Sequence, residues 1–417
     1  MDSIIVTGGH SLSGRVAVGG AKNSALKLMA ASLLARGVTS LSNVPDIADI
    51  SVMAELLEGL GVSVQRHDHW LTLDATDVAS AEAPYEMVAR MRASISVLGA
   101  LVGRIGRAHV AMPGGCNIGS RKVDMHLKGL EAMGAEITTG HGYISAIAPS
   151  GGLSGADIYL DFPSVGATEN LLMAAVTAGG TTTIENAARE PEIIDLASML
   201  VEMGARISGH GSSLIEVTGV SSLSAVEHRV VGDRIEAGTF IIAAALDGGP
   251  VEVRGFDPAH LDIVLGKLAE AGVTVERLED GVRIARDGPL RSVDVATLPY
   301  PGFPTDLQAP WMTLMSLADG SSVITENVFE NRFMFADELS RMGADIRIDG
   351  HHALIKGVTA LSGAQVRSPD LRGGAALVMA GLVADGRTEV SDVYHIERGY
   401  EAFTDKLTAL GAEVRCH

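Results

Sequence analysis

The sequence predicts an α/β fold made of six repeated units, each about 70 residues long. Two interleaved patterns, each occurring six times, predict it. In the first, an amphipathic helix is followed by a glycine and a short alternating strand. In the second, an apolar helix rich in small residues is followed by a glycine, a strand and a polar loop. One match would be weak support, but twelve matches in two registers indicate a repeated α/β fold.

The first pattern places a glycine where each helix ends. It reads AELLEGLGVSVQ in the first copy, and its alternation with period two predicts a strand after the glycine. Glycine suits this position because a helix C-terminus commonly needs a left-handed backbone conformation. Charged residues along one face lead us to expect these helices to face solvent. The glycines are Gly61, Gly134, Gly204, Gly272, Gly343 and Gly411, and subtraction gives spacings of 73, 70, 68, 71 and 68.

The second pattern contains helices that are apolar nearly all round, as in residues 26–34 and 171–178, which predicts that they are buried. Its loops carry residues that could meet a ligand on one rim, although charged loop residues are usually solvated. Six units could close as a ring or divide into three plus three, and periodicity alone does not choose. In copy order the loop residues are Asp49, Cys116 with Arg121, Glu190, Asp257, Arg332 and Arg398.

Composition excludes several classes of protein. The 417 residues suffice for two or three domains, and a net charge of −19 argues against a general surface for nucleic acid or anionic membranes. An anionic ligand would therefore need a local cationic pocket. Two cysteines give no disulfide framework and suit a reducing cytoplasm, and the acidic N-terminus is unlike a signal peptide. No G-x-G-x-x-G motif follows the first strand, and GGHSLSGR lacks the lysine of a P-loop.

The stretch MPGGCNIGSRKVD, residues 112–124, is the most unusual of the loops. Its three glycines allow backbone conformations that a β-carbon would forbid. Cys116 is followed by Arg121 and Lys122, and a thiol in a cationic loop is more acidic and more reactive than a free cysteine. Taken alone, the stretch could equally be a surface turn with an unreactive cysteine.

Ten motifs, in order along the chain, resemble those of the enolpyruvyl transferases. The Gly-Gly-Cys loop and ENAAREPE are similar to the branch that acts on a UDP-sugar, and the branch that acts on 3-phosphoshikimate does not carry them. The motifs are GGAKNSAL at 19–26, MRASISVLG at 91–99, PGGCNIGSR at 113–121, FPSVGAT at 162–168, ENAAREPEI at 185–193, DRIEAGTF at 233–240, PGFPTDLQA at 301–309, ENRF at 330–333, DLR at 370–372 and IERGYE at 396–401.

The resemblance implies an inside-out α/β barrel fold, in which two globular domains each contain three βαβαββ units with the helices inside. It implies a first domain at 21–231 that carries the cysteine loop and the UDP-sugar contacts. The second domain would consist of 1–20 plus 232–417. That domain would carry the half of the active site that contains Asp306, Arg332, Arg372 and Arg398.

The reaction implied by the resemblance is transfer of enolpyruvate from phosphoenolpyruvate to the 3-hydroxyl of UDP-N-acetylglucosamine, with release of phosphate. Addition and elimination need an acid near the methylene carbon and a base near the hydroxyl. Cys116 resembles the family's acid and should be alkylated by fosfomycin. Asp306 resembles the base, although Thr305 and Asp306 could instead cap a helix. Lys22 and Arg398 resemble the family's catalytic cations, and the chemistry needs no cofactor or metal.

Further residues match the family's substrate contacts. A phosphoenolpyruvate site should be dense in cationic groups because this substrate carries several negative charges. Many relatives have Pro where this chain has Lys122, and some have a basic residue where it has Phe162, and these departures bear on nucleotide affinity. The cationic and sugar-binding positions are Lys22, Asn23, Arg92, Arg121, Arg332, Asp370, Arg372 and Arg398. The nucleotide positions are Arg121, Lys122, Val123, Asp124, Met125, His126, Ser164, Val165 and Gly166, with Val328 from the second domain.

Two other functions stay open. One is the same chemistry on another nucleotide acceptor, and the intact ENAAREPE and FPSVGAT motifs argue for the UDP-sugar instead. The other is a catalytically silent regulator, which the joint presence of Lys22, Cys116, Asp306 and Arg398 argues against. The partners expected are small molecules, without nucleic acid or membrane, because the longest apolar runs are too short to cross a bilayer. The expected location is the cytoplasm.

Overall fold

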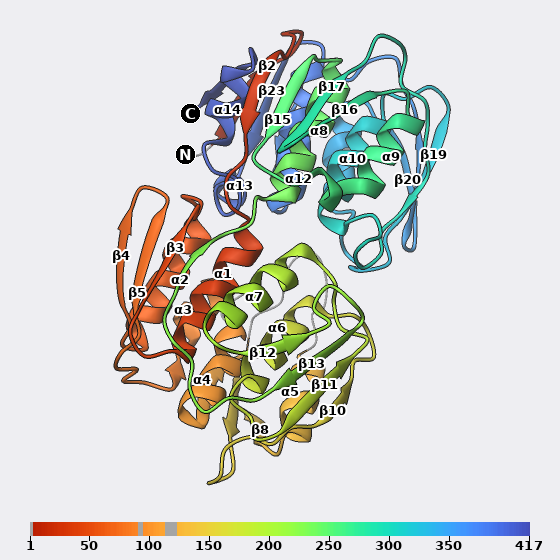
Figure 1. Ribbon diagram of the computed structural model, residues 1–417. Coiled ribbons are helices and arrows are strands. Elements are labelled where there is room, and N and C mark those ends of the chain that lie inside the picture. The colour runs from red at the N-terminus through yellow and green to blue at the C-terminus, as the bar shows by residue number, and fades with distance from the viewer. Residues whose placement is uncertain (1–2, 91–94, 113–122) are drawn as a thin grey trace. The chain divides into compact units, whose positions relative to one another are not determined.

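The computed structural model describes residues 3–90, 95–112 and 123–417. Within these ranges the chain forms two compact units (Figure 1), one from residues 20–231 and one from residues 3–19 together with 232–417. The chain therefore passes between the units twice, at residues 19–20 and at residues 231–232. No helix in the described ranges is both long and apolar enough to cross a membrane.

Six four-stranded sheets carry the strands of the described residues, three in each unit. In the unit of residues 20–231 the sheet orders are β14 (Glu227–Arg229), β3 (Val38–Ser42), β5 (Trp70–Asp74), β4 (Ser63–His67); β6 (Glu82–Ala83), β7 (Arg107–Ala111), β9 (Tyr143–Ile147), β8 (Glu136–Gly140); and β10 (Asp157–Tyr159), β11 (Thr181–Glu185), β13 (Leu214–Thr218), β12 (Arg206–Ser208).

The second unit repeats this arrangement. Its sheet orders are β2 (Gly14–Ala17), β15 (Val251–Arg254), β17 (Gly281–Ala285), β16 (Thr274–Leu278); β18 (Val295–Ala296), β19 (Ser321–Thr325), β21 (His352–Lys356), β20 (Asp345–Asp349); and β22 (Gln365–Arg367), β23 (Arg387–Ser391), β1 (Ser3–Thr7), β24 (Glu413–Cys416).

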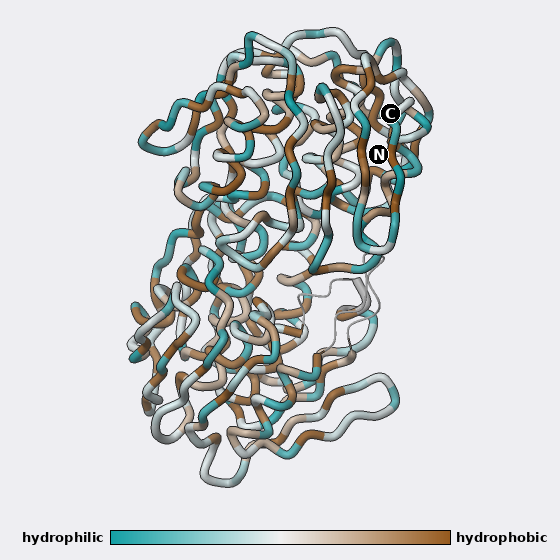
Figure 2. Tube along the Cα trace, turned by 90° about the vertical axis from the view of Figure 1, so that its right-hand side faces the viewer, coloured by the Kyte–Doolittle hydropathy of each residue, from teal (hydrophilic) through white to brown (hydrophobic). Residues whose placement is uncertain are grey.

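All six sheets are mixed in the same way. The first strand of each order is parallel to the second, and the remaining neighbours are antiparallel. Apolar and polar residues alternate along many strands (Figure 2), so one face of each is buried. The predicted α/β class with six repeats is confirmed, and the strands pair in mixed sheets.

Helices lie between the sheets of each unit in Figure 1. In residues 20–231 they are α1 (Lys22–Ala31), α2 (Ala48–Gly59), α3 (Tyr85–Arg90), α4 (Val97–Ile105), α5 (Asp124–Ala132), α6 (Val165–Ala175) and α7 (Pro191–Glu202), with the 3₁₀ turn η1 (Ser32–Leu34). The second unit has α8 (Arg234–Asp247), η3 (Pro258–Leu261), α9 (Asp262–Glu270), η4 (Thr305–Leu307), α10 (Gln308–Met315), α11 (Ala336–Arg341), α12 (Leu371–Val383), α13 (Tyr394–Glu397) and α14 (Phe403–Ala409).

Burial follows the apolar pattern of the second repeat. In α6 every residue from Ala167 to Ala175 is buried, and α12 is buried from Arg372 to Leu382. The expectation that helices of the first repeat face solvent is wrong for α7. Its Glu192 and Asp195 are both buried, which brings charge into the core of the unit.

The glycines that end the first-repeat helices all have the predicted left-handed conformation. Their φ angles are 102° at Gly61, 93° at Gly134, 107° at Gly204, 92° at Gly272, 97° at Gly343 and 107° at Gly411. At these angles any residue with a β-carbon is strained. The period of the glycines is therefore a period of helix ends, as the sequence predicts.

Replacing Gly204 tests this reading. A β-carbon at Gly204 would meet no atom within 4 Å, so Gly204→Ala changes only the backbone preference. We expect it to lower the free energy of unfolding by about 1 kcal/mol. Gly266 in α9 has equally open surroundings without a left-handed φ, and Gly266→Ala should stabilise by roughly 0.5–1 kcal/mol. Thermal unfolding of both variants measures the difference, and equal shifts of the two would contradict the assignment.

Candidate active site

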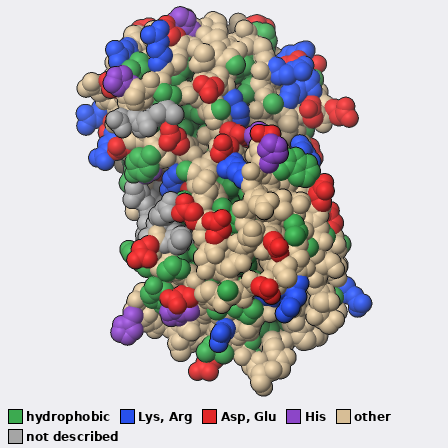
Figure 3. Space-filling view, turned by 90° about the vertical axis from the view of Figure 1, so that its left-hand side faces the viewer, with side chains coloured by type: hydrophobic (Ala, Val, Ile, Leu, Met, Phe, Trp, Pro, Cys, Tyr) green, Lys and Arg blue, Asp and Glu red, His purple; other side chains and the backbone are tan. Residues whose placement is uncertain are grey.

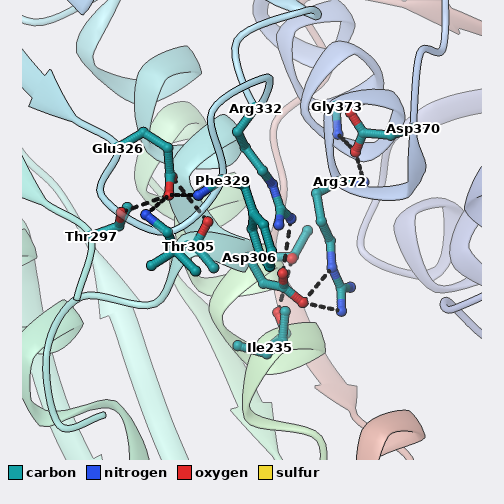
Figure 4. A network of polar contacts seen from close by, with 12 residues as sticks. Ile235, Thr297, Thr305, Asp306, Glu326, Phe329, Arg332, Asp370, Arg372 and Gly373 are labelled. Carbon is teal, nitrogen blue, oxygen red and sulfur yellow. Dashed lines mark hydrogen bonds and ion pairs between the residues drawn. The ribbon is translucent and has the colours of Figure 1, made fainter. Parts of the chain in front are cut away.

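A carboxylate held between two arginines is the centre of the candidate site (Figure 4). Asp306 lies in η4, and its Oδ1 accepts a hydrogen bond of 2.8 Å from Arg332 Nη2. Its Oδ2 accepts bonds of 2.9 Å from Nη2 and 3.1 Å from Nε of Arg372. Both guanidinium side chains are buried, whereas the carboxylate is about a quarter exposed, with 25% of its side-chain surface accessible. The sequence placed these three residues at one site, and the fold brings them into contact.

The loop before Arg332 is fixed by another carboxylate, the buried Glu326 (Figure 4). Its Oε1 accepts hydrogen bonds from Thr297 Oγ1 at 2.9 Å, from Val328 N at 2.8 Å and from Phe329 N at 3.0 Å. Its Oε2 accepts one of 2.9 Å from Thr305 Oγ1. Glu326 therefore ties the loop that carries Arg332 to the residue next to Asp306.

Arg372 is positioned by the start of α12. Asp370 is the N-cap, and its Oδ1 accepts hydrogen bonds of 2.9 Å from Arg372 N and 3.0 Å from Gly373 N. The guanidinium carbon lies 5.1 Å from the centre of the Tyr400 ring, within reach of a cation–π contact. The Tyr400 hydroxyl lies 2.9 Å from Thr239 Oγ1. Burial alone would lower the pKa of Arg372, but Tyr400 and Asp306 raise it, so the guanidinium stays charged.

Each of the two arginines keeps a spare donor. Nη1 of Arg332 and Nη1 of Arg372 are buried and have no hydrogen-bond partner among the described residues. A buried donor without a partner is costly, and an ionised donor more so. The arrangement therefore favours an anionic ligand with oxygen atoms that can accept from both guanidinium groups.

The unit of residues 20–231 holds the candidate lysine. Lys22 is the first residue of α1, and its Nζ lies 2.8 Å from Asp49 Oδ2. Both side chains are buried, whereas Asn23 is exposed. The start of a helix favours anions, so Lys22 and the backbone of α1 can attract a negative group together.

The predicted nucleotide residues gather at the starts of α5 and α6. Val123 is the N-cap of α5, followed by Asp124, Met125 and the buried His126. Ser164 caps α6, since its Oγ accepts a bond of 3.3 Å from Ala167 N, and Val165 begins that helix. The two helix starts adjoin, because a β-carbon on Gly166 would lie 3.2 Å from His126 Cε1.

His126 is neutral in this position. Burial, together with the charge of Lys27, lowers its pKa to about 4. Its Nδ1 lies 2.8 Å from Asn170 Nδ2, which makes this nitrogen the acceptor and leaves the proton on Nε2. A neutral imidazole at a helix start can donate one hydrogen bond to an anion without adding charge.

The remaining predicted residues are less informative. Arg92, Cys116, Arg121 and Lys122 lie outside the described residues. Arg398 is the C-cap of α13, and both it and Val328 are partly buried. No group of three metal-ligating side chains occurs within the described ranges.

The helix-cap alternative that the sequence raised for Asp306 is corrected by the structure. The cap positions before η4 and α10 are Pro304 and Leu307, so Asp306 is not at a cap position. Asp257 is itself a cap, because its Oδ1 accepts a bond of 2.9 Å from Ala259 N at the start of η3. Its carboxylate therefore has a local structural role.

Sequence reasoning missed a buried ion pair between two apolar helices. Lys27 Nζ of α1 lies 2.6 Å from Glu169 Oε2 of α6. Burial raises the pKa of Glu169 to about 7, although Lys27 opposes the shift. The signal was present, since a charged residue within a helix that is apolar on all sides must find a partner.

The sequence and the fold are similar to those of known proteins. The chain belongs to the EPSP synthase (3-phosphoshikimate 1-carboxyvinyltransferase) family, whose model matches residues 6–407. Within this family of enzymes the chain is 54% identical over 413 residues to the UDP-N-acetylglucosamine 1-carboxyvinyltransferases of Mycolicibacterium paratuberculosis and Mycobacterium tuberculosis. The matches cover 99% of this chain and 99% and 98% of those proteins.

Two solved structures of enolpyruvyl transferases have a similar fold. The enolpyruvyl transferase NikO from Streptomyces tendae superposes with a TM-score of 0.88 at 28% identity, over 99% of this chain and 98% of that one. EPSP synthase from Acinetobacter baumannii has a TM-score of 0.77 at 20% identity, over 100% of this chain and 99% of that one, which shows the shared fold.

Anion binding at the two arginines can be measured by thermal shift. Phosphoenolpyruvate should raise the melting temperature, because a ligand that binds only the native state stabilises it by mass action. In Arg372→Gln we expect most of this rise to be lost. Arg347→Gln removes an exposed arginine of β20 and should keep it. The ligand-induced shift is compared within each variant, so a change in the melting temperature without ligand does not affect the result. An undiminished shift in Arg372→Gln would argue against the anion site.

The buried pair gives a pH dependence of stability. Because the native pKa of Glu169 is raised from 4.5 to about 7, its contribution to the free energy of unfolding falls as pH rises through this window. Replacing both partners in Lys27→Met/Glu169→Leu should remove a fall on the order of 1 kcal/mol between about pH 6 and pH 8.

Denaturant titrations at both pH values measure that fall. The matched control is Lys267→Met/Glu270→Leu, which removes a pair 2.8 Å apart on the surface of α9. This variant should show the same fall in the free energy of unfolding between the two pH values as wild type. If wild type and the buried double variant showed the same fall in the free energy of unfolding, the raised pKa of Glu169 would be refuted.

Proposed function

We propose that the chain transfers enolpyruvate from phosphoenolpyruvate to the 3-hydroxyl of UDP-N-acetylglucosamine, with release of phosphate. This is the first committed step of peptidoglycan synthesis. The observation that carries the proposal is the pair of spare buried guanidinium donors beside Asp306, which suits a multiply charged small anion. The names of the relatives support the choice of acceptor. Acidic side chains are spread over the surface in Figure 3, so attraction of such a substrate depends on the local site.

The proposed chemistry is addition followed by elimination through a tetrahedral intermediate. Cys116 donates a proton to the methylene carbon, the adjacent carbon becomes electrophilic, and the sugar hydroxyl forms a bond to it while losing its proton. Loss of a proton from the new methyl group and departure of phosphate then restore the double bond. Lys22 and Arg398 would neutralise the charge of phosphoenolpyruvate and of the leaving phosphate.

Asp306 would accept the proton of the hydroxyl, and its arginine partners bear on that role. A carboxylate held by two guanidinium groups is a weak base, since both bonds favour its ionised form. A phosphoenolpyruvate bound to the spare Nη1 donors would share the positive charge of the same two guanidinium groups with Asp306. Substrate binding would then weaken the two ion pairs and increase the basicity of Asp306 where the proton is removed.

The proposal extends to the architecture and the location. The domains would be 21–231, with the cysteine loop and the nucleotide contacts, and 1–20 plus 232–417, with Asp306 and the arginines. Each would be an inside-out barrel of three βαβαββ units, a view supported by the helices buried on all sides. The reaction would take place in the cytoplasm, and fosfomycin would inhibit it by alkylating Cys116.

A second candidate is enolpyruvyl transfer to a different acceptor. NikO, which is 28% identical over nearly the whole chain, is named only as an enolpyruvyl transferase, so this similarity supports the reaction without choosing the acceptor. A screen of nucleoside and nucleotide acceptors at equal concentration separates the two candidates. Preference for an acceptor without the N-acetylglucosamine group would favour the second.

Phosphate release tests the proposed reaction. We expect wild type to release phosphate only when phosphoenolpyruvate and UDP-N-acetylglucosamine are both present, and fosfomycin to abolish the release. Cys116→Ser should lose most activity, because a hydroxyl is a far weaker acid than a thiol. The exposed Cys416 provides the control, and Cys416→Ser should keep both activity and fosfomycin sensitivity. A folded wild type that releases no phosphate would exclude this reaction.

A further inference from the structure

A second buried carboxylate, outside the predicted site, contacts three separate segments of the unit of residues 20–231. Asp195 of α7 has 9% of its surface exposed. Its Oδ2 accepts a hydrogen bond of 2.5 Å from Ser24 Oγ of α1 and one of 3.2 Å from Val231 N. Its Oδ1 lies 2.9 Å from His228 Nε2 of β14. One carboxylate thus joins α7 to the start of α1, to β14 and to the last residue of the unit.

His228 supplies the charge that Asp195 needs. Its Nδ1 lies 2.8 Å from Glu202 Oε2, so each ring nitrogen faces a carboxylate. Burial would lower the pKa of His228, but the hydrogen bonds to Asp195 and Glu202 outweigh it and raise the pKa. A doubly bonded imidazolium donates from both nitrogens, which fixes the ring and orients Asp195. Among the described residues, the charged groups that face the His228 ring are these two carboxylates of α7. Leu41 is the neighbour of His228 on β3.

Val231 is held on both of its backbone groups. Its N–H donates to Asp195, and its carbonyl accepts a bond of 2.7 Å from Ala21 N. Ala21 is the N-cap of α1, immediately before Lys22. Val231 therefore contacts the start of α1 directly through Ala21, and indirectly through Asp195 and Ser24.

The start of α1 lacks the usual means of fixing a helix end. Ala21 has no side chain that could cap, and the first turn contains no acidic residue. Asp195 brings a negative charge to this turn from a neighbouring helix, which the helix dipole favours. The two residues before Ser24 are Asn23 and Lys22, both of which are expected to contact substrate.

We propose that Asp195, oriented by His228, is a positioning residue that holds the first turn of α1 to the segment at Val231 and so sets the place of Lys22 and Asn23. This inference rests on the proposed function, because the positions of Lys22 and Asn23 affect activity only if these residues contact substrate. The hydrogen bond from Ser24 is the link to α1, because without it Asp195 would hold only β14 and Val231. When His228 loses its proton as pH rises, Asp195 loses its cation and the link weakens.

Kinetics with phosphoenolpyruvate and UDP-N-acetylglucosamine test the link. A shift of about 1 Å in a substrate-positioning group costs on the order of 100-fold. We therefore expect kcat/KM to fall about 10- to 100-fold in Asp195→Asn, and less in Ser24→Ala. His228→Gln should lose part of the decline in kcat/KM that wild type shows as pH rises. His352→Gln removes an exposed histidine of β21 and should match wild type throughout.

Amide hydrogen exchange gives a readout that needs no activity. Asp195→Asn should speed exchange at Val231 and in the first turn of α1, whereas Ser24→Ala should do so only in α1. Folded Asp195→Asn and Ser24→Ala variants with wild-type kcat/KM and pH profile would overturn the proposal. If Asp195→Asn does not fold, wild-type kcat/KM in Ser24→Ala is sufficient to overturn it.

The two proposals can fail separately. A wild type that is inactive with both substrates contradicts the proposed function, and exchange then decides the role of Asp195. Unchanged exchange in α1 of both variants would contradict the link. Faster exchange in α1, with wild-type kcat/KM in an active enzyme, would show that the link is structural only and would also overturn the positioning role.

Discussion

Complete burial of the small-residue helices is the constraint on which the rest of the structure depends. Helices such as α6, α8 and α12 are surrounded by protein, so they tolerate little charge along their length. Polar side chains therefore gather where these helices begin. Lys22 starts α1, Ser164 precedes α6, and Arg372 lies in the first turn of α12. Helix starts also favour anions, so the places that accept polar residues are those best suited to a phosphorylated substrate.

Two buried lysines among the described residues are paired with carboxylates, whereas two buried arginines at the candidate site each keep a donor without a partner. Lys22 pairs with Asp49 and Lys27 with Glu169, each within one unit. Such pairs contribute little net stability because desolvation offsets their attraction. Arg332 and Arg372 share Asp306 and still retain buried nitrogens without partners among the described residues. An arrangement that is incomplete without a ligand is a stronger indication of binding than a complete ion pair.

The sequence predicted the repeat, the left-handed glycines and the buried helices, because period and glycine conformation are local properties. It placed Asp306, Arg332 and Arg372 in one half of the site only through resemblance, since 66 residues separate Asp306 from Arg372, and it did not predict their contact. It did not predict the group around Asp195. Ser24 lies 171 residues from Asp195, and no local pattern indicates that a serine in one helix donates to an aspartate in another. Long-range polar contacts depend on tertiary packing, which periodicity does not encode.

At each of the two places where the chain leaves one unit for the other, a backbone N–H donates to a carboxylate that is itself paired with a cation. At residue 231, Asp195 accepts a hydrogen bond from Val231 N and is paired with His228. At residue 19, Glu236 accepts a hydrogen bond of 3.0 Å from Gly19 N, and Lys406 Nζ lies 2.6 Å from the other carboxylate oxygen. Burial raises the pKa of Glu236 to about 7, although Lys406 opposes the shift. Glu236 therefore gains a proton as pH falls, whereas His228 loses one as pH rises. A group whose pKa is raised in the folded protein contributes stability that is lost as pH rises, so both crossings should become less stable as pH rises.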